Sequence, residues 1–393
     1  MTDAVVIVGA ARTPMGSFQG DFAALAAHDL GAAAIQAAVA RAAVAPDAVD
    51  EVLFGNCLMA GQGQAPARQA ALKAGLPISA GAVTLSKMCG SGMRAAMFGH
   101  DMLVAGSADV IVAGGMESMT NAPYLLPKAR GGYRIGHDRI FDHMMLDGLE
   151  DAYEPGRSMG TFGEDCAAKY SFTREQQDNF ATASVQRAQA AISSGAFSAE
   201  ITPVTVKGRA GDKVISVDEG PGKARLDKIA SLKPAFKKDG TITAASSSSI
   251  NDGAAAMVLM RESTAAKFGC KPLARIKAHA VHAQEPNWFA TAPVGSVRKV
   301  LAKSGWAVSD VDLWEVNEAF AVVPMALMHD LSLRHEVVNV NGGACALGHP
   351  IGASGARIMV TLMYALQARG LKKGIATLCI GGGEATAVAL EML

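Results

Sequence analysis

Hydrophobic and polar positions alternate in two different rhythms along the 393-residue chain. Short apolar runs rich in β-branched residues, such as residues 4–10 (AVVIVGA) and 273–281 (LARIKAHAV), are typical of buried strands. Amphipathic stretches separate these runs and indicate helices. The alternation predicts βα crossovers, and therefore an α/β fold in which helices cover buried sheets.

The same sequence of elements occurs twice. Three pairs of segments repeat at nearly the same offset: residues 49–56 (VDEVLFGN) with 311–318 (VDLWEVNE), 91–94 (SGMR) with 354–357 (SGAR), and 108–117 (ADVIVAGGME) with 376–384 (ATLCIGGGE). One such similarity could arise by chance, but several at one offset indicate an internal duplication. We therefore predict two copies of one α/β unit.

A long insertion interrupts the first copy. The strand pattern of residues 252–260 resembles that of the C-terminus, yet it follows the GGME segment only after a long intervening stretch. We predict a first half from residues 1–120 with 250–268, an inserted domain over 121–249, and a second half over 269–393. Between residues 201 and 240 there are nine Lys/Arg against five Asp/Glu. This excess indicates either a solvated loop or a binding surface for a polyanionic ligand.

Composition and charge exclude several classes of protein. Half of the residues are hydrophobic and 18% are charged, with 36 basic residues against 36 acidic ones. A neutral chain argues against nucleic acid as the main partner. No apolar run approaches the roughly 20 residues of a membrane-spanning helix, and no signal peptide or peroxisomal address is evident. We expect a cytoplasmic protein.

The six cysteines do not form a recognisable metal or disulfide pattern. None belongs to a CxxC pair, and no His/Cys spacing matches a zinc site, so we expect no metal. Cys57, Cys166 and Cys270 have ordinary neighbours and are predicted to be small buried residues.

Two residues, Cys89 and His349, lie among glycines directly before predicted helices. A thiol at a helix N-terminus experiences the positive end of the helix dipole, which is expected to lower its pKa. The duplication places His349 in the second copy three residues earlier in register than Cys89 in the first. Two related units packed about a pseudo-twofold axis would bring the two side chains together as a Cys–His pair.

Two further candidates lie at the ends of predicted strands. Cys379 is followed by a glycine run that begins at Gly381, and such loops present backbone amides suited to an oxyanion. Asn317, in the segment EVNEAF, offers a side-chain amide that could orient a water molecule or an oxyanion.

Taken together, these segments resemble the thiolase family over the whole chain. The motifs are CGSGMRA at 89–95, GGMESMTNAPY at 114–124, INDGAAA at 250–256, NEAF at 317–320, NGGACALGHPIGASGAR at 341–357 and CIGGGEA at 379–385. The resemblance implies duplicated βαβαβαββ units that form a five-layered α-β-α-β-α core with an inserted loop domain. It also implies that coenzyme A thioesters are substrates and that no cofactor is permanently bound.

The resemblance assigns roles to the candidate residues. Cys89 would be acylated by an acyl-CoA, His349 would take the thiol proton, and Cys379 would exchange a proton with the α-carbon of the second substrate. Asn317, through a water molecule, and His349 would form one oxyanion hole. The amides of Cys89 and Gly381 would form the other.

Residues that bind coenzyme A are carried over in the same way. The candidates for this role are Ser158, Met159, Lys223, Arg225, Phe236, Ala244, Ser248, Phe289 and Phe320. Lys223 and Arg225 are candidates near the adenine end, whereas Phe289 and Phe320 resemble residues that line a short acyl pocket. Ser158 stands where the family often has a histidine.

The function implied is condensation of two acetyl-CoA molecules to acetoacetyl-CoA, and the reverse thiolysis of short 3-ketoacyl-CoA. The alternatives are a thiolase of fatty-acid degradation that accepts longer chains, a ketoacyl synthase, and a non-catalytic acyl-CoA carrier. A homotetramer, a dimer of dimers, is expected. A disulfide between Cys89 and Cys379 would add a thiol switch, and Cys345, close in sequence to His349, has no assigned role.

Overall fold

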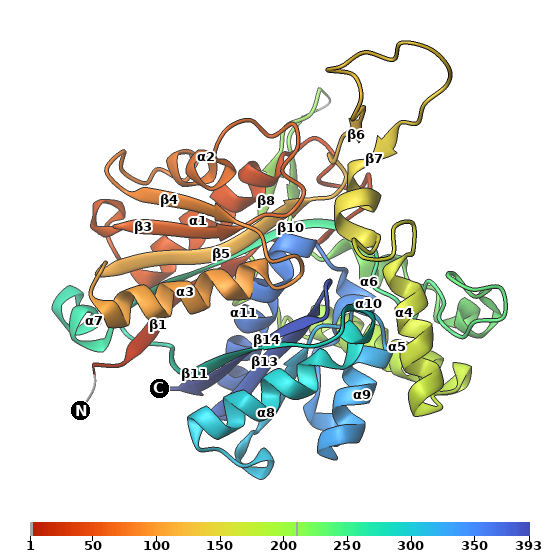
Figure 1. Ribbon diagram of the computed structural model, residues 1–393. Coiled ribbons are helices and arrows are strands. Elements are labelled where there is room, and N and C mark those ends of the chain that lie inside the picture. Colours follow the sequence, from red (N-terminus) through yellow and green to blue (C-terminus); the bar gives the residue numbers. More distant parts are fainter. Residues whose placement is uncertain (1–2, 210) are drawn as a thin grey trace.

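A computed structural model describes residues 3–209 and 211–393 of the chain (Figure 1). The first copy contains, in order, β1 (Val5–Arg12), α1 (Ala27–Ala42), β3 (Glu51–Gly55), α2 (Pro66–Lys73), β4 (Gly81–Leu85), α3 (Ser91–Ala105), β5 (Val110–Ser118) and β10 (Asn251–Arg261). The second copy contains β11 (Ala274–Ala283), α8 (Ala292–Ser304), β12 (Leu313–Val316), α9 (Val322–Leu331), α11 (Ile351–Arg369), β13 (Lys373–Ile380) and β14 (Glu384–Met392).

The strand pairing confirms the duplicated α/β fold. The sheet runs β12-β13-β14-β11-β1-β10-β5-β3-β4, so the two halves are mirror-ordered about the β11–β1 junction. Equivalent strand pairs are parallel in the two halves, β3 with β5 and β12 with β13, and β3 also pairs in parallel with β4. Both copies even share one irregularity, a register shift after Ile7 in β1 and after Ile276 in β11.

The second copy departs from the predicted pattern at one strand. In the first copy β4 pairs with β3 over five residues. In the second copy the corresponding segment makes a single bridge, between Trp314 and Val338, before the chain enters α10 (Ala344–Leu347). The second unit is therefore shorter by one strand in the part of the chain that the structure describes.

Five layers result, as predicted. Helices α1 and α2 cover the outer face of the first half, and α8 and α9 cover the outer face of the second. Helices α3 and α11 lie between the two halves of the sheet and contribute to one apolar core with strands of both (Figure 1). Among the described residues, the sheet halves meet over only two residue pairs, Val6 with Arg275 and Ile7 with Ala274. The central helices therefore hold the halves together.

Two glycines allow α3 and α11 to approach closely. A Cβ atom at Gly92 would lie 2.8 Å from the backbone nitrogen of Ala356. A Cβ atom at Gly355 would lie 2.5 Å from the backbone nitrogen of Met93. Gly92 and Gly355 are equivalent positions of the SGMR and SGAR repeats, so the two copies touch backbone to backbone at symmetry-related residues.

The chain between β5 and β10 leaves the sheet and forms the region predicted as an insertion. Its elements are β6 (Tyr124–Leu125), β7 (Phe141–Asp142), a π-helical turn η2 (Met145–Leu149), α4 (Met159–Tyr170), α5 (Arg174–Ser193), β8 (Val204–Val206), β9 (Lys213–Ile215), α6 (Glu219–Lys223) and the turn η3 (Leu226–Ser231). Helix α4 packs on α9, and α5 packs on α10, so both helices rest on the second copy. The remaining short elements are β2 (Gly16–Ser17), α7 (Glu262–Phe268), η1 (Pro46–Ala48), η4 (Pro286–Thr291), η5 (Val308–Asp310) and η6 (His335–Val337).

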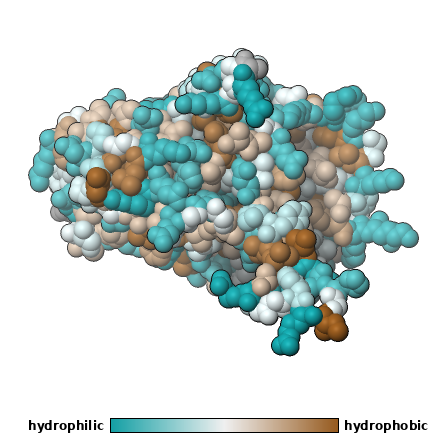
Figure 2. Space-filling view, turned by 90° about the horizontal axis from the view of Figure 1, so that it is seen from above, coloured by the Kyte–Doolittle hydropathy of each residue, from teal (hydrophilic) through white to brown (hydrophobic). Residues whose placement is uncertain are grey.

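A buried ion pair network anchors the insertion to the sheet. Arg12 at the end of β1 donates to Glu200 at 2.6 Å and to Asp218 at 2.7 and 2.9 Å, and all three side chains are buried. The surface seen from above is mainly hydrophilic, with hydrophobic side chains in small separate groups (Figure 2). Of the helices within residues 3–209 and 211–393, none is both long and apolar enough to cross a membrane.

Candidate active site

Cys89 lies two residues before the first residue of α3, in a turn held by hydrogen bonds. The hydroxyl of Ser91 donates to the carbonyl of Met88 at 2.6 Å and accepts from the amide of Lys87 at 2.8 Å. Met88 has a φ of +45°, a left-handed conformation that few non-glycine residues adopt. The turn therefore fixes the position of the thiol before any substrate arrives.

Burial, not the helix dipole, controls the ionisation of this thiol. Loss of solvent raises the pKa of Cys89 to about 11, and the buried carboxylate of Glu117 acts in the same direction. The backbone amides of Gly381 and of Cys89 itself lower the pKa, but by less. The sequence-based expectation of a lowered pKa was therefore wrong, because desolvation of a thiolate outweighs the field of a helix end. Both amides point at the Cys89 sulfur. They are therefore also placed to donate to the oxyanion that would form when this sulfur attacks a carbonyl.

His349 occupies the matching place before α11, two residues ahead of its first residue. The hydroxyl of Ser354 donates to the carbonyl of Pro350 at 2.8 Å and lies 2.5 Å from Nδ1 of His349. Because that hydroxyl has one proton and gives it to the carbonyl, Nδ1 must carry the imidazole proton and donate it. The other nitrogen, Nε2, is then an unprotonated acceptor.

The imidazole rests in its neutral form. Burial lowers the pKa of His349 to about 3, and the positive charge of Arg357 contributes in the same direction. Its Nε2 lies 3.4 Å from Nδ2 of Asn317, which follows directly after β12. A neutral imidazole with a free Nε2 is the form that can accept the proton of a thiol.

Cys379 and Gly381 come from the end of β13, opposite Cys89. Cys379 is fully buried, and burial followed by the charge of a Cys89 thiolate raises its pKa well above the ordinary value. Lys87 and Glu384 form an ion pair that joins the Cys89 turn to the glycine loop after Cys379. The structure places Cys89, Cys379 and Gly381 next to one another, and it places His349 next to Asn317. The sequence analysis proposed these five residues from separate segments.

A cavity of about 270 Å³ leads to His349 and lies between the insertion and the core. Its lining includes five of the residues predicted to bind coenzyme A, namely Ser158, Met159, Phe236, Ser248 and Phe320. Most of the other lining side chains are apolar, among them Met119, Met145, Leu149, Ile250 and Ile351. The cavity suits a ligand whose reactive end enters an apolar pocket.

The comparisons with known proteins agree with this geometry. The models of the thiolase N-terminal and C-terminal domains match residues 5–263 and 270–392. The chain belongs to the thiolase family. It is 50% identical to an acetyl-CoA acetyltransferase of Chromobacterium violaceum over 98% of this chain and 99% of the relative. A relative of the same name from Rhizobium meliloti is also 50% identical, over 99% of each chain.

Solved structures of thiolases resemble the chain closely. The crystal structure of the Bacillus anthracis acetyl-CoA acetyltransferase has a TM-score of 0.97 at 42% identity, and the match covers 100% of this chain and 99% of that one. The Acat5 thiolase from Ascaris suum, in complex with coenzyme A, has a TM-score of 0.94 at 41% identity, with 99% and 100% covered.

Four predicted coenzyme A contacts lie outside the cavity lining of this thiolase. Phe289 is buried behind Phe320, with ring centroids 6.3 Å apart, so it supports the pocket wall instead of forming it. Ala244 is exposed on the loop before β10. Lys223 pairs with Glu219, and Arg225 pairs with Asp227 at 3.0 Å, both on the surface.

Two residues near the thiol were not recognised from the sequence. Cys57, predicted to be an ordinary buried residue, donates its thiol proton to the Met88 carbonyl at 3.2 Å and therefore touches the Cys89 turn. Glu117 accepts from the amides of Cys57 and Gly352, at 3.0 and 2.9 Å, and so joins the two halves beside the site. The GGME repeat contained Glu117, but its role was not evident.

Cys345 belongs to a buried hydrogen-bond network on the far side of Asn317. Its amide donates to the carboxylate of Glu318 at 2.9 Å, which also accepts from Ser184 at 2.7 Å. Burial, with the nearby Glu318 charge, raises the pKa of its thiol well above the ordinary value. These contacts give Cys345 a structural place beside the insertion.

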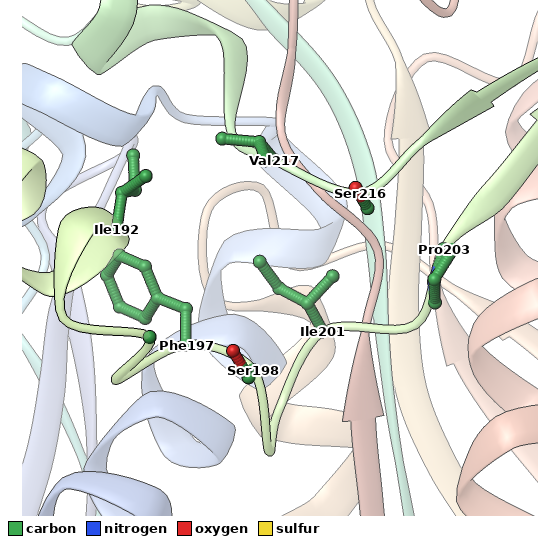
Figure 3. A pocket seen from close by; sticks show the side chains of 8 residues that line it. Ile192, Phe197, Ser198, Ile201, Pro203, Ser216 and Val217 are labelled. Atoms are coloured by element: carbon green, nitrogen blue, oxygen red, sulfur yellow. The ribbon is translucent and has the colours of Figure 1, made fainter.

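A second hollow of about 330 Å³ lies away from the thiols (Figure 3). Its lining is drawn from the end of α5 and the segments that follow, including Ile192, Phe197, Ile201 and Val217. The only side-chain polar atoms in this lining are the hydroxyls of Ser198 and Ser216. It therefore has no group that could act on a thioester.

Ser354 should control the rate at which Cys89 is acylated. In Ser354→Ala, Nδ1 loses its acceptor and the imidazole is no longer held with Nε2 free. We expect transfer of acetyl between CoA molecules to slow by about 10- to 100-fold, the range seen when a partner that orients a histidine is removed. Isotope exchange between labelled CoA and acetyl-CoA measures this rate.

Ser304→Ala is the matched control, because Ser304 is also buried and donates to a carbonyl of its own helix, Leu301, at 3.0 Å. Equal exchange rates in the two variants would refute the role given to Ser354.

Proposed function

We propose that the chain is an acetyl-CoA C-acetyltransferase that condenses two acetyl-CoA molecules and cleaves acetoacetyl-CoA in reverse. The observations that carry this proposal are a Cys89 thiol that lies beside the Gly381 amide and the buried Cys379 thiol, and a neutral imidazole, His349, that lines an apolar cavity between the insertion and the core. The names of relatives at about half identity over nearly the whole chain support the same substrate.

The first half-reaction stores an acetyl group on Cys89. Nε2 of His349 takes the thiol proton as Sγ attacks the thioester carbonyl, the bond to the CoA sulfur breaks, and the proton passes to the departing thiolate. Negative charge develops on the carbonyl oxygen during attack. Each donor aimed at that oxygen stabilises the transition state by about 3–4 kcal/mol.

The second half-reaction forms the carbon–carbon bond. Cys379 first gives its proton to Nε2 of His349, which is free again once the first CoA has left. As a thiolate it then removes a proton from the methyl group of a second acetyl-CoA, and the resulting carbon attacks the acetyl group on Cys89. The S–C bond to Cys89 breaks as the new bond forms, and the Cys89 thiolate takes the proton from His349. A positioned base contributes about 100- to 10,000-fold. Asn317 and His349 lie within 3.4 Å of each other and would stabilise the enolate oxygen.

The wall of the cavity favours substrates with a short acyl group. Phe320 packs edge-on against both Phe236 and Phe289, at centroid distances of 5.6 and 6.3 Å. This braced aromatic cluster leaves little freedom for the wall to open. The alternative, a thiolase for longer 3-ketoacyl-CoA, requires the cluster to move. Relative kcat/KM for acetoacetyl-CoA and longer 3-ketoacyl-CoA substrates separates these possibilities.

The insertion supplies the surface for the remainder of coenzyme A. Ser158, Met159 and Ser248 face the cavity, and the basic excess over residues 201–240 suits the phosphates. Lys223 and Arg225 would leave their present carboxylate partners to reach them. We expect a cytoplasmic enzyme of short-chain fatty-acid metabolism with no permanently bound cofactor.

Cys379→Ser should separate the two half-reactions. A serine hydroxyl at this buried position is far too weakly acidic to take a proton from carbon. We expect acetylation of Cys89 and isotope exchange to persist, while condensation and thiolysis fall by at least about 100-fold. Cys270→Ser, at a buried thiol remote from the site, is the control.

Loss of both activities in Cys379→Ser would contradict separate roles for the two thiols. Absence of exchange in the unmodified protein would instead favour a non-catalytic acyl-CoA carrier.

We also propose a homotetramer built as a dimer of dimers. Strand β4 lies at one end of the sheet, with Val83 half-exposed, and such an edge can pair with a second copy. Residues 126–140, between β6 and β7, project from the body (Figure 1), and Ile135 is 97% exposed there. A dimer of dimers needs two separate interfaces on each chain.

Light scattering tests the assembly. Ile135→Asp should reduce the tetramer to a dimer, because a charge in place of this exposed apolar side chain opposes its burial in an interface. Phe268→Asp, at a half-exposed site of α7, should leave the tetramer intact. A monomeric unmodified protein, or equal behaviour of the two variants, would overturn the proposed arrangement.

A further inference from the structure

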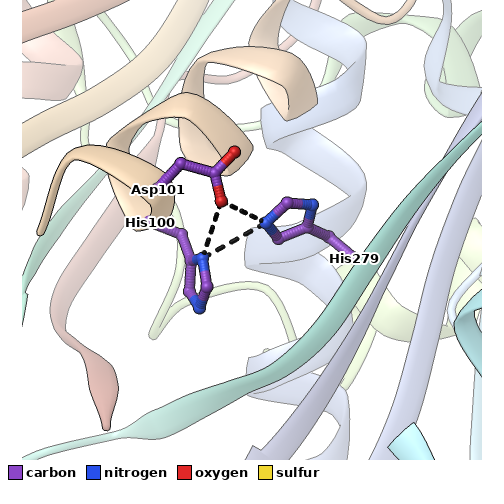
Figure 4. A group of neighbouring side chains, drawn as sticks. All are labelled: His100, Asp101 and His279. Carbon is purple, nitrogen blue, oxygen red and sulfur yellow. Dashed lines mark hydrogen bonds and ion pairs between the residues drawn. The ribbon is translucent and has the colours of Figure 1, made fainter. Parts of the chain in front are cut away.

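Three potential metal ligands, His100, Asp101 and His279, converge on one another (Figure 4). His100 and Asp101 come from the second half of α3, and His279 comes from β11 of the other copy. Cys89 lies near the start of the same helix, so about 16 Å of helix axis separates the cluster from the thiol. The reaction proposed above uses none of these residues.

The spacing of the ligand atoms is that of a first coordination shell. Nδ1 of His100 and Nε2 of His279 are 3.2 Å apart, and Oδ1 of Asp101 is 3.2 Å from the first and 2.9 Å from the second. In a tetrahedral zinc site with bonds of about 2.0–2.1 Å, neighbouring ligand atoms are about 3.3 Å apart. A movement of these three atoms by a few tenths of an ångström would place them at three of the four ligand positions of such a site.

The cluster is open to a cation from solution. Lys303 is the nearby cation, but its Nζ donates to the backbone carbonyl of His279 at 3.1 Å and does not occupy the cluster. Asp101 is half-exposed, so a fourth position faces solvent.

We propose that His100, Asp101 and His279 bind a divalent transition metal ion, with Zn²⁺ the best match to two imidazoles and one carboxylate. The fourth ligand would be water. The sequence did not reveal this site because His279 lies 179 residues from His100. The ion would join α3 of one copy to β11 of the other, and β11 is also the strand through which the sheet halves meet.

The chain offers an internal reference for this proposal. His329 and Asp330 on α9 form the same adjacent pair, with Nδ1 3.0 Å from a carboxylate oxygen. No third ligand atom lies close enough to this pair within the described residues. Only the His100–Asp101 pair, with its histidine from another element, has the complete set.

Zinc titration against a chromophoric chelator tests the site. The full chain carries Cys89→Ser and Cys379→Ser in every sample, so that the reactive thiols cannot bind the metal. We expect one Zn²⁺ per chain, at least about tenfold weaker binding in His279→Gln, and unchanged binding in His329→Gln. Zn²⁺ should raise the Tm only where His279 is present, because the ion binds the folded chain.

Equal binding in the two glutamine variants, or no binding in the parent above that of His279→Gln, would overturn the proposal. His279→Gln with both thiols intact should keep its full rate of acetyl exchange, which excludes misfolding as the cause of lost binding.

Discussion

The close approach of α3 and α11, with Gly92 against Ala356 and Gly355 against Met93, is the constraint on which the site depends. No side chain larger than hydrogen fits at either position, because the facing backbone already lies within 3 Å of where a Cβ would stand. The close crossing places the start of both helices at one point between the sheet halves. Cys89 and His349 precede those helix starts, so the packing of the core determines the distance between the catalytic groups.

The two copies use equivalent residues for different purposes. Ser91 and Ser354 are the same position of the repeat, and each donates to a backbone carbonyl before its helix. In the first copy the serine oxygen accepts from the Lys87 amide and shapes the turn of the nucleophile. In the second it accepts from Nδ1 of His349 and holds the tautomer of the base. A symmetric scaffold thus supports an asymmetric reaction.

The fold could be predicted from the sequence because the same strand and helix patterns occur in it twice. Such a repeat can be recognised without knowing which residues are in contact. The absence of a full strand near Val338 could not be predicted, because a segment that forms one bridge and a segment that forms a five-residue strand have similar compositions. Cys89, His349, Cys379 and Gly381 were proposed because they lie in or beside glycine runs, and Asn317 because it ends a predicted strand. The orienting role of Ser354 and the nearness of Cys57 depend on three-dimensional contacts.

The wrong prediction for the Cys89 pKa has a clear physical reason. A helix start is visible in sequence, and its field favours a thiolate. Desolvation is not visible in sequence, and at this partly buried position it is the larger effect. A neutral thiol beside a neutral imidazole also protects the free enzyme, because a thiol reacts with oxidants far more slowly than a thiolate. The proton then moves only when a thioester is in place.

The most direct test of this account is the pH dependence of Cys89 alkylation in the free enzyme. Iodoacetamide labelling, followed by peptide mass spectrometry that separates Cys89 from Cys57 and Cys379, gives the rate at each pH. Since the thiol pKa is about 11 and that of His349 about 3, the rate should rise about tenfold per pH unit from about pH 6 to about pH 9. A rate that is already constant over this range would show a preformed thiolate–imidazolium pair and contradict the account.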